Sequence, residues 1–127
     1  MHADRRILRH LPRIPETGLR RHVQRGPWLH LLSQVLQLAG PEAAFVRHCE
    51  RPWSSATFAG WRHTIALSFT GEEAIESGED FVMLLPDHEF SIPSQIVADA
   101  TITQVEHCAL PEAVMHVELE MLLLLEA

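Results

Sequence analysis

The chain has 127 residues, 46% of them hydrophobic, which suits one domain with one core, and no apolar run approaches the roughly 18 to 20 residues that a bilayer crossing needs. It contains no lysine, so lysine Schiff-base chemistry and the lysine-bearing phosphate loop are excluded, and its glycines and serines match no dinucleotide-binding or hydrolase motif. The net charge of −7 is divided: residues 1–26 hold seven arginines against two acids, a net +5, whereas residues 27–127 hold three arginines against fifteen acids, a net −12.

Residues 1–26 are expected to form an arginine-rich arm ahead of a single domain at 27–127. Pro12, Pro15, Gly18 and the pair Gly26-Pro27 interrupt any long helix in this segment. Arginine forks suit carboxylates, so we expect the arm to dock on the acidic body, its own or a neighbour's. A solvated tail and a nucleic-acid-binding arm are the alternatives. The arginines are Arg5, Arg6, Arg9, Arg13, Arg20, Arg21 and Arg25.

The first element expected in the body is a helix over residues 27–39, because apolar residues recur there at helical spacing and Gly40-Pro41 follows. A short strand is expected over 43–50, with a turn at Arg51-Pro52. A long half-buried strand is expected over 57–69, where apolar and polar residues alternate.

A second helix is expected over residues 71–84. Thr70 followed by Glu73 has the spacing of a capping box, and Pro86 ends the segment. Gly78 lies in the middle and disfavours a helix by about 1 kcal/mol relative to alanine. The alternative is a break at Gly78, with residues 81–85 forming a strand.

After a short extended piece at 89–92, a β-hairpin is expected to join residues near 96–107 to residues near 112–125. A four-residue loop that pairs His107 with Glu112 sets Ala100 opposite Leu119 and Asp99 opposite Glu120, so apolar and polar pairs separate onto two faces. The expected fold is α+β: an antiparallel sheet of four to five strands with two helices on one face, in the order α-β-β-α-(β)-β-β.

The polar face of this hairpin is the first candidate site. It carries Asp99, His116, Glu118 and Glu120, which can bind arginines, hold a cation or pair an imidazole with a carboxylate for proton transfer. An ordinary solvated sheet face is the alternative.

Two further groups are weaker candidates. His88 stands between Asp87 and Glu89 just after Pro86, and the dipeptide His-Cys occurs twice, ending at Cys49 and Cys108. Neighbouring residues on a strand point to opposite faces, so one ion could not take both members of such a pair. Because no spacing aims three or four ligands at one point, we expect no bound transition metal and no cofactor.

His63 lies on the apolar face of its strand beside Trp61. We interpret it as a core or interface histidine with a satisfied hydrogen bond, and a ligand pocket lined by Trp61 and His63 is the alternative. The weak candidates for catalysis are thus His63, His88, His116 and Glu118.

The function expected is that of a small homo-oligomeric structural or interaction protein without a cofactor, most simply a dimer. The last strand is apolar on both faces at its end, and Leu122 and Leu124 on its second face would be covered by a partner copy. Docking of the first helix or of the N-terminal arm over these two leucines is the competing explanation. The alternatives are a small enzyme or ligand binder, and a nucleic-acid binder, which the acidic body disfavours. Two cysteines without a Cys-x-x-Cys motif and no secretory signal indicate a cytoplasmic protein, and the absence of lysine, asparagine and tyrosine, which have AT-rich codons, indicates a bacterial gene.

Overall fold

The computed structural model describes the backbone of residues 18–126 and the side chains of residues 28–126. In this range the chain forms, in order, α2 (Gly18–Ala39), β1 (Ala43–Ser54), β2 (Ala59–Thr70), α3 (Glu72–Leu84), the 3-10 turn η2 (Leu85–Asp87), β3 (Gln95–Cys108) and β4 (Val114–Leu125). The order of helices and strands is α-β-β-α-β-β, which confirms the expected α+β fold.

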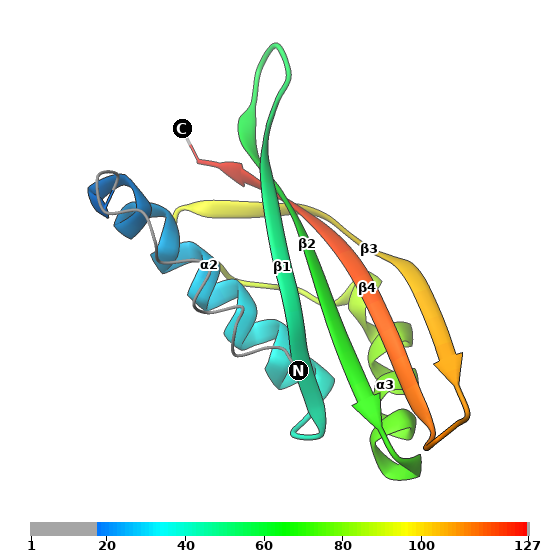
Figure 1. Cartoon of the computed structure of the whole chain (residues 1–127). Coiled ribbons are helices and arrows are strands. Elements are labelled where there is room, and N and C mark those ends of the chain that lie inside the picture. Colours follow the sequence, from blue (N-terminus) through cyan, green and yellow to red (C-terminus); the bar gives the residue numbers. More distant parts are fainter. Residues whose placement is uncertain (1–17, 127) are drawn as a thin grey trace.

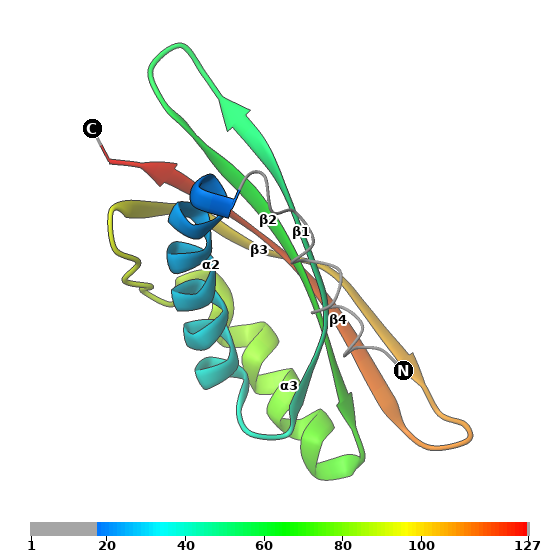
Figure 2. The ribbon, with the colours of Figure 1, turned by 60° about the vertical axis from the view of Figure 1, so that its left-hand side comes forward.

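The four strands form one antiparallel sheet in the order β1-β2-β4-β3. Both helices lie on the same face of this sheet, as the two views in Figures 1 and 2 show. The other face, called the open face below, is not covered by the described helices.

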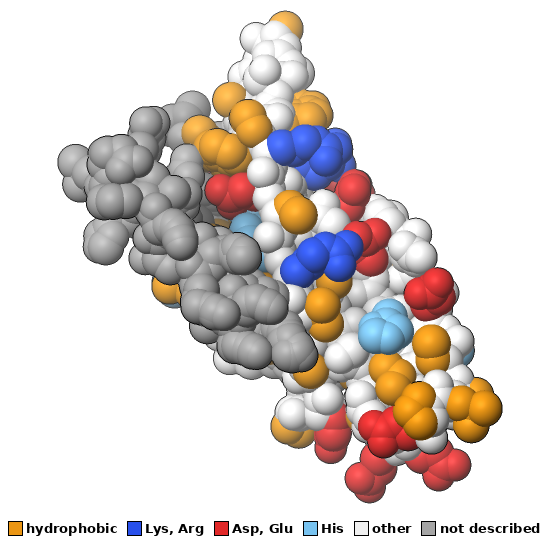
Figure 3. All heavy atoms as spheres, viewed as in Figure 1, with side chains coloured by type: hydrophobic (Ala, Val, Ile, Leu, Met, Phe, Trp, Pro, Cys, Tyr) orange, Lys and Arg blue, Asp and Glu red, His pale blue; other side chains and the backbone are white. Residues whose placement is uncertain are grey.

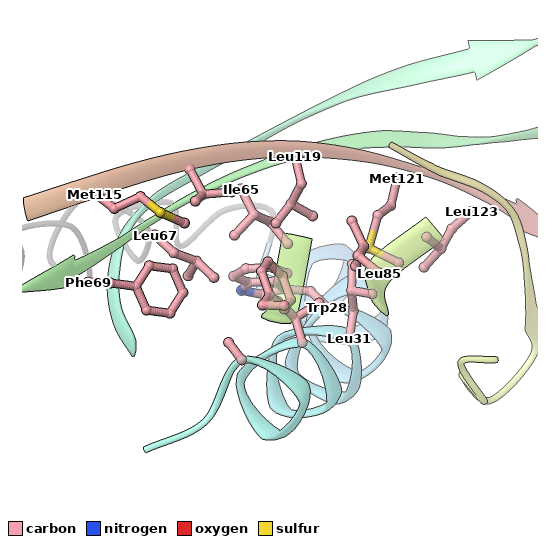
Figure 4. Packing of buried hydrophobic residues seen from close by; sticks show 14 of the residues in the cluster. Trp28, Leu31, Ile65, Leu67, Phe69, Leu85, Met115, Leu119, Met121 and Leu123 are labelled. Atoms are coloured by element: carbon pink, nitrogen blue, oxygen red, sulfur yellow. The ribbon is translucent and has the colours of Figure 1, made fainter. Parts of the chain in front are cut away.

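The core fills the space between the sheet and the two helices. β2 and β4 direct alternate apolar side chains toward the helices, and Trp28 and Leu31 of α2 meet them from the other side (Figure 4). The fully buried side chains of the two strands are Ile65, Leu67, Phe69, Met115, Val117, Leu119, Met121 and Leu123. Burial of these side chains contributes about 1.5 to 3 kcal/mol each, which explains why the alternating pattern of β2 could be recognised in the sequence.

Helix α2 begins at Gly18 and not at the expected Pro27, so residues 18–26 of the expected arm are helical. Proline costs about 3 kcal/mol inside a helix because its nitrogen cannot donate to the carbonyl four residues back. The helix nevertheless continues through Pro27 to Ala39. The remainder of the expected arm, residues 1–17, lies outside the described residues.

Strand β1 is longer than expected and passes through Arg51-Pro52, where a turn was expected. Because β1 is at the edge of the sheet, the missing N–H of Pro52 interrupts no central ladder. The turn is at residues 55–58, where the backbone N–H of Ser55 donates to the Phe58 carbonyl at 2.8 Å.

Helix α3 is one continuous helix through Gly78, so the alternative with a break is wrong. A Cβ on Gly78 would lie 2.8 Å from the Phe69 ring, and glycine therefore allows the helix to approach the sheet closely. The expected capping box is also wrong. Thr70 is the last residue of β2, and the N-cap is Gly71 with φ 97°, which has no side chain to make a capping hydrogen bond.

The hairpin of β3 and β4 is present, but its expected register is wrong. Ala100 lies opposite Met121 and not Leu119, and Asp99 lies opposite Leu122 and not Glu120. The loop is one residue longer than expected, and irregularities between Val97 and Asp99 and between Ile102 and Gln104 each shift the pairing by one residue. An extra residue reverses the alternation beyond it, so Val97, and not Ile96, faces the helices.

Candidate functional site

The pairing of β1 with β2 brings two histidines and a glutamate together on the face that the helices cover. His48 and Glu50 are alternate residues of β1 and therefore point to the same side of the sheet. Glu50 lies directly opposite His63 of β2. These three residues, called the His-Glu cluster below, come from strands joined by the turn at residues 55–58.

The side-chain atoms of the His-Glu cluster converge closely. His48 Nε2 and His63 Nδ1 are 2.9 Å apart, a hydrogen-bond distance. Glu50 Oε1 lies 3.6 Å from His63 Nδ1 and 3.8 Å from His48 Nε2. All three potential ligand atoms lie within 4.8 Å of one another.

Helix α2 closes the cluster with an aromatic side chain. The Trp28 ring stacks on His48 with ring centroids 3.5 Å apart and an interplanar angle of 10°, and it lies nearly parallel to His63 at 6.2 Å. The side chains of His48 and His63 are only 6% and 5% exposed, whereas that of Glu50 is 30% exposed. The imidazoles are thus enclosed, and the carboxylate connects them to solvent.

Burial keeps both imidazoles neutral at pH 7. Desolvation by burial, together with the neighbouring His63, lowers the pKa of His48 to about 3, and burial lowers the pKa of His63 to about 4. Between two neutral imidazoles, one of the facing nitrogens donates its proton and the other accepts it. The cluster therefore offers imidazole lone pairs and a carboxylate oxygen, which are proton acceptors and metal ligands.

Sequence reasoning singled out His63 but missed Glu50 and the contact with His48. The signal that could have found them is the alternation of His48 and Glu50 on one strand. A hairpin turning at residues 55–58 places residue 50 opposite residue 63, whereas the expected turn at Arg51-Pro52 removed this pairing.

The open face carries the other expected site residues. Its side chains form rows across the strand order β1-β2-β4-β3. One row is Arg51, Arg62, Leu122 and Asp99, the next is Cys49, Thr64, Glu120 and Thr101, and the third is Arg47, Ala66, Glu118 and Gln104. Arginines therefore belong to β1 and β2, and acids belong to β3 and β4. Figure 3 shows basic and acidic side chains side by side on this face.

Two carboxylates expected to receive the arm are already near arginines of the body. Arg47 Nη2 donates to Glu118 Oε2 at 2.9 Å, and Arg62 Nη1 lies 3.6 Å from Glu120 Oε1. Asp99 accepts a hydrogen bond from the Thr101 hydroxyl at 3.3 Å and lies in a different row from Glu120. Asp99 and Glu120 therefore do not lie opposite each other as expected, and Glu118 and Glu120 have arginine contacts that sequence reasoning missed. His116 also belongs to the open face, near Glu106.

The row at the end of the open face is apolar. It consists of Trp53, Gly60, Leu124 and Ile96. Ile96 is 48% exposed, whereas Leu122 in the adjoining row is only 8% exposed. Neighbouring side chains within one chain thus cover most of Leu122, which was expected to need a partner for its burial.

The remaining candidates do not join either group. Trp61 lies on the helix-facing side near the start of β2, and His88 lies in an exposed loop, where its ring packs edge-on with that of Phe90. Cys49 and Cys108 are both exposed and free. Of the arm's arginines, Arg20, Arg21 and Arg25 belong to α2, and the other four lie outside the described residues.

Comparison of the chain with protein-family models, with curated proteins and with solved structures finds no match. Among the described helices, none combines the length and apolar character that a membrane crossing requires.

Proposed function

We propose that the protein is a small homo-oligomeric interaction protein whose open face pairs with the open face of a second copy. The observation that carries this proposal is the division of charge across that face. Arg47, Arg51 and Arg62 belong to its β1-β2 half, whereas Glu118, Glu120 and Asp99 belong to its β4-β3 half. A face with one basic and one acidic half is complementary to its own rotated copy.

The rows determine which rotation fits. A twofold axis parallel to the strands lays the β1 half of one copy over the β3 half of the other and keeps each row at the same height. Arg51 then lies over Asp99 of the second copy, and the apolar row with Ile96 meets its equivalent. An axis perpendicular to the strands would instead lay arginines over arginines. The first arrangement is aligned packing of two sheets, which is common in sandwiches.

The filled core favours this proposal over a ligand pocket between sheet and helices. The buried side chains of α2 and α3 pack directly on those of β2 and β4, and Leu31, Phe69, Phe81 and Leu119 have no exposed surface. Pairing of the open faces itself requires no cofactor. It covers Ile96, which one chain leaves exposed.

The substitution Ile96→Asp tests the proposal. It places a charge in the apolar row of the pairing face. Because Ile96 is already about half buried in one chain, each copy loses about 1 kcal/mol of apolar burial and must also desolvate the new charge, and symmetry repeats this loss in both copies. We expect the dissociation constant to rise by roughly tenfold for each copy affected. Light scattering after size-exclusion chromatography measures the mass directly.

The matched control is Leu84→Asp on α3. Leu84 is 52% exposed, close to the 48% of Ile96, but it lies on the helix side of the sheet. This variant should keep the mass of the unaltered protein. Equal loss of mass in both variants, or a monomeric unaltered protein at tens of micromolar, contradicts the proposal. If the unaltered protein has the mass of more than two chains, the basic half of each copy binds the acidic half of the next, and the copies form a ring.

A further inference from the structure

The spacing of the His-Glu cluster fits a metal ion. In a tetrahedral site with ligands about 2.0 to 2.1 Å from zinc, neighbouring ligand atoms lie about 3.4 Å apart. The three separations within the cluster are 2.9, 3.6 and 3.8 Å. Shifts of about half an ångström or less would bring all three separations to this value.

The donor types also fit. Two imidazole nitrogens and one carboxylate oxygen form one of the protein ligand sets of open zinc sites, in which water or another small ligand takes the fourth position. The carboxylate offsets part of the charge of a divalent ion. Cys49 lies between His48 and Glu50 in sequence but belongs to the opposite face of the sheet, so its thiol is not part of the set.

The surroundings hold the ligands in position. Ring stacking on Trp28 fixes the plane of the His48 imidazole, and strand pairing fixes Glu50 opposite His63. Because the Glu50 side chain is 30% exposed, an ion can reach the buried nitrogens from solvent past the carboxylate.

We propose that His48 Nε2, His63 Nδ1 and the Glu50 carboxylate bind one divalent first-row transition-metal ion, such as zinc, with a fourth position open to water. This site goes beyond the proposed pairing function. It also replaces the expectation of no metal, because that expectation assumed that no three ligands meet at one point.

The test is a zinc titration of the full chain after treatment with a chelator, in competition with a chromophoric zinc indicator. We expect close to one zinc per chain at this site. The substitutions His48→Gln, His63→Gln and Glu50→Gln each remove one ligand. Loss of a residue that only hydrogen-bonds to a metal ligand weakens metal binding by roughly 10- to 100-fold, so loss of a ligand itself should weaken zinc binding by at least that factor. His116→Gln, which alters a histidine of the open face, is the matched control and should bind like the unaltered chain.

A second readout locates the ion. Cobalt bound at His48 should quench the fluorescence of Trp28, because the two rings are stacked at 3.5 Å. In the double variant Trp53→Phe, Trp61→Phe, Trp28 is the remaining tryptophan, so the quenching is assigned to it. The quenching should disappear when Glu50→Gln is added.

Three outcomes overturn the proposal. The unaltered, folded protein binds no zinc in the titration; all three ligand variants bind zinc as the unaltered protein does; or bound cobalt leaves Trp28 fluorescence unchanged. If His48→Gln and His63→Gln do not fold, Glu50→Gln decides, because its partly exposed side chain can be altered without opening the core.

Discussion

Two buried imidazoles make the stability of the metal-free protein sensitive to mild acid. The pKa values of His48 and His63 are lowered to about 3 and about 4 in the folded chain, against 6.5 for an unperturbed histidine. The unfolded chain therefore binds more protons below pH 6.5, and its protonation favours unfolding. The stabilisation is complete above about pH 6.5 and is lost as the pH falls from there toward 4 for His63 and toward 3 for His48.

Urea unfolding of the chelator-treated protein should therefore give a lower midpoint at pH 5 than at pH 7. We expect a loss of about 1 to 2 kcal/mol for each histidine over this interval. His63→Leu should remove part of this pH dependence, whereas His116→Gln on the open face should retain it. Parallel pH profiles for the unaltered protein and His63→Leu would contradict this assignment.

His63 and Glu50 show which parts of the His-Glu cluster could be predicted from the sequence and which could not. His63 could be assigned to the core because its neighbours at alternate positions are apolar. Glu50 could not be assigned to it, because a charged residue before Arg51-Pro52 is typical of a solvated turn. Its position became apparent only from the pairing of β1 with β2, a non-local contact that no pattern within β1 reveals.

At the scale of elements, the substitution Gly78→Ala should have two opposing effects on the free energy of unfolding. Gly78→Ala favours the helix by about 1 kcal/mol through intrinsic propensity. The added Cβ would also lie 2.8 Å from the Phe69 ring, which is fully buried and cannot move aside. Overpacking of this kind costs about 1 to 3 kcal/mol, so we expect net destabilisation.

Thermal and urea unfolding measure this balance. Glu79→Ala, at an exposed position of the same helix, supplies the control with alanine but without the clash. It should change the free energy of unfolding by less than about 0.5 kcal/mol. A more stable Gly78→Ala variant would mean that the approach of α3 to β2 is looser than described.

The elements themselves could be predicted where one periodic pattern ran unbroken. β2 and α3 were expected within one or two residues of their observed ends, because burial imposes a regular alternation or stripe on both. The errors arose where a local signal was overridden: Pro27 did not start its helix, and Pro52 did not end its strand. The hairpin register was wrong because its irregularities add residues that alternation alone cannot detect.

At the scale of the whole molecule, the fold class followed from the order of elements, since consecutive antiparallel strands must bury one face under helices. The opposition of charge was expected between an arm and the body. Within the described residues it is instead present across the open face, where arginines of β1 and β2 lie in the same rows as acids of β3 and β4. This division supports pairing between copies.

The most direct test of that pairing is a charge swap between residues that only a second copy can bring together. Arg51 and Asp99 lie at opposite edges of the sheet in the same row, three strand spacings or roughly 14 Å apart, so they do not contact each other within one chain. Arg51→Glu and Asp99→Arg should each weaken association by at least about tenfold, because like charges then face each other across the contact. The double variant restores opposite charges in both symmetric positions.

Sedimentation equilibrium of these three variants beside the unaltered protein is the decisive measurement. Pairing of the open faces predicts a dimer for the unaltered protein, a shift toward monomer for each single variant, and recovery of the dimer for the double variant. The account is contradicted if the double variant associates more weakly than either single variant, or if all four proteins have the same mass.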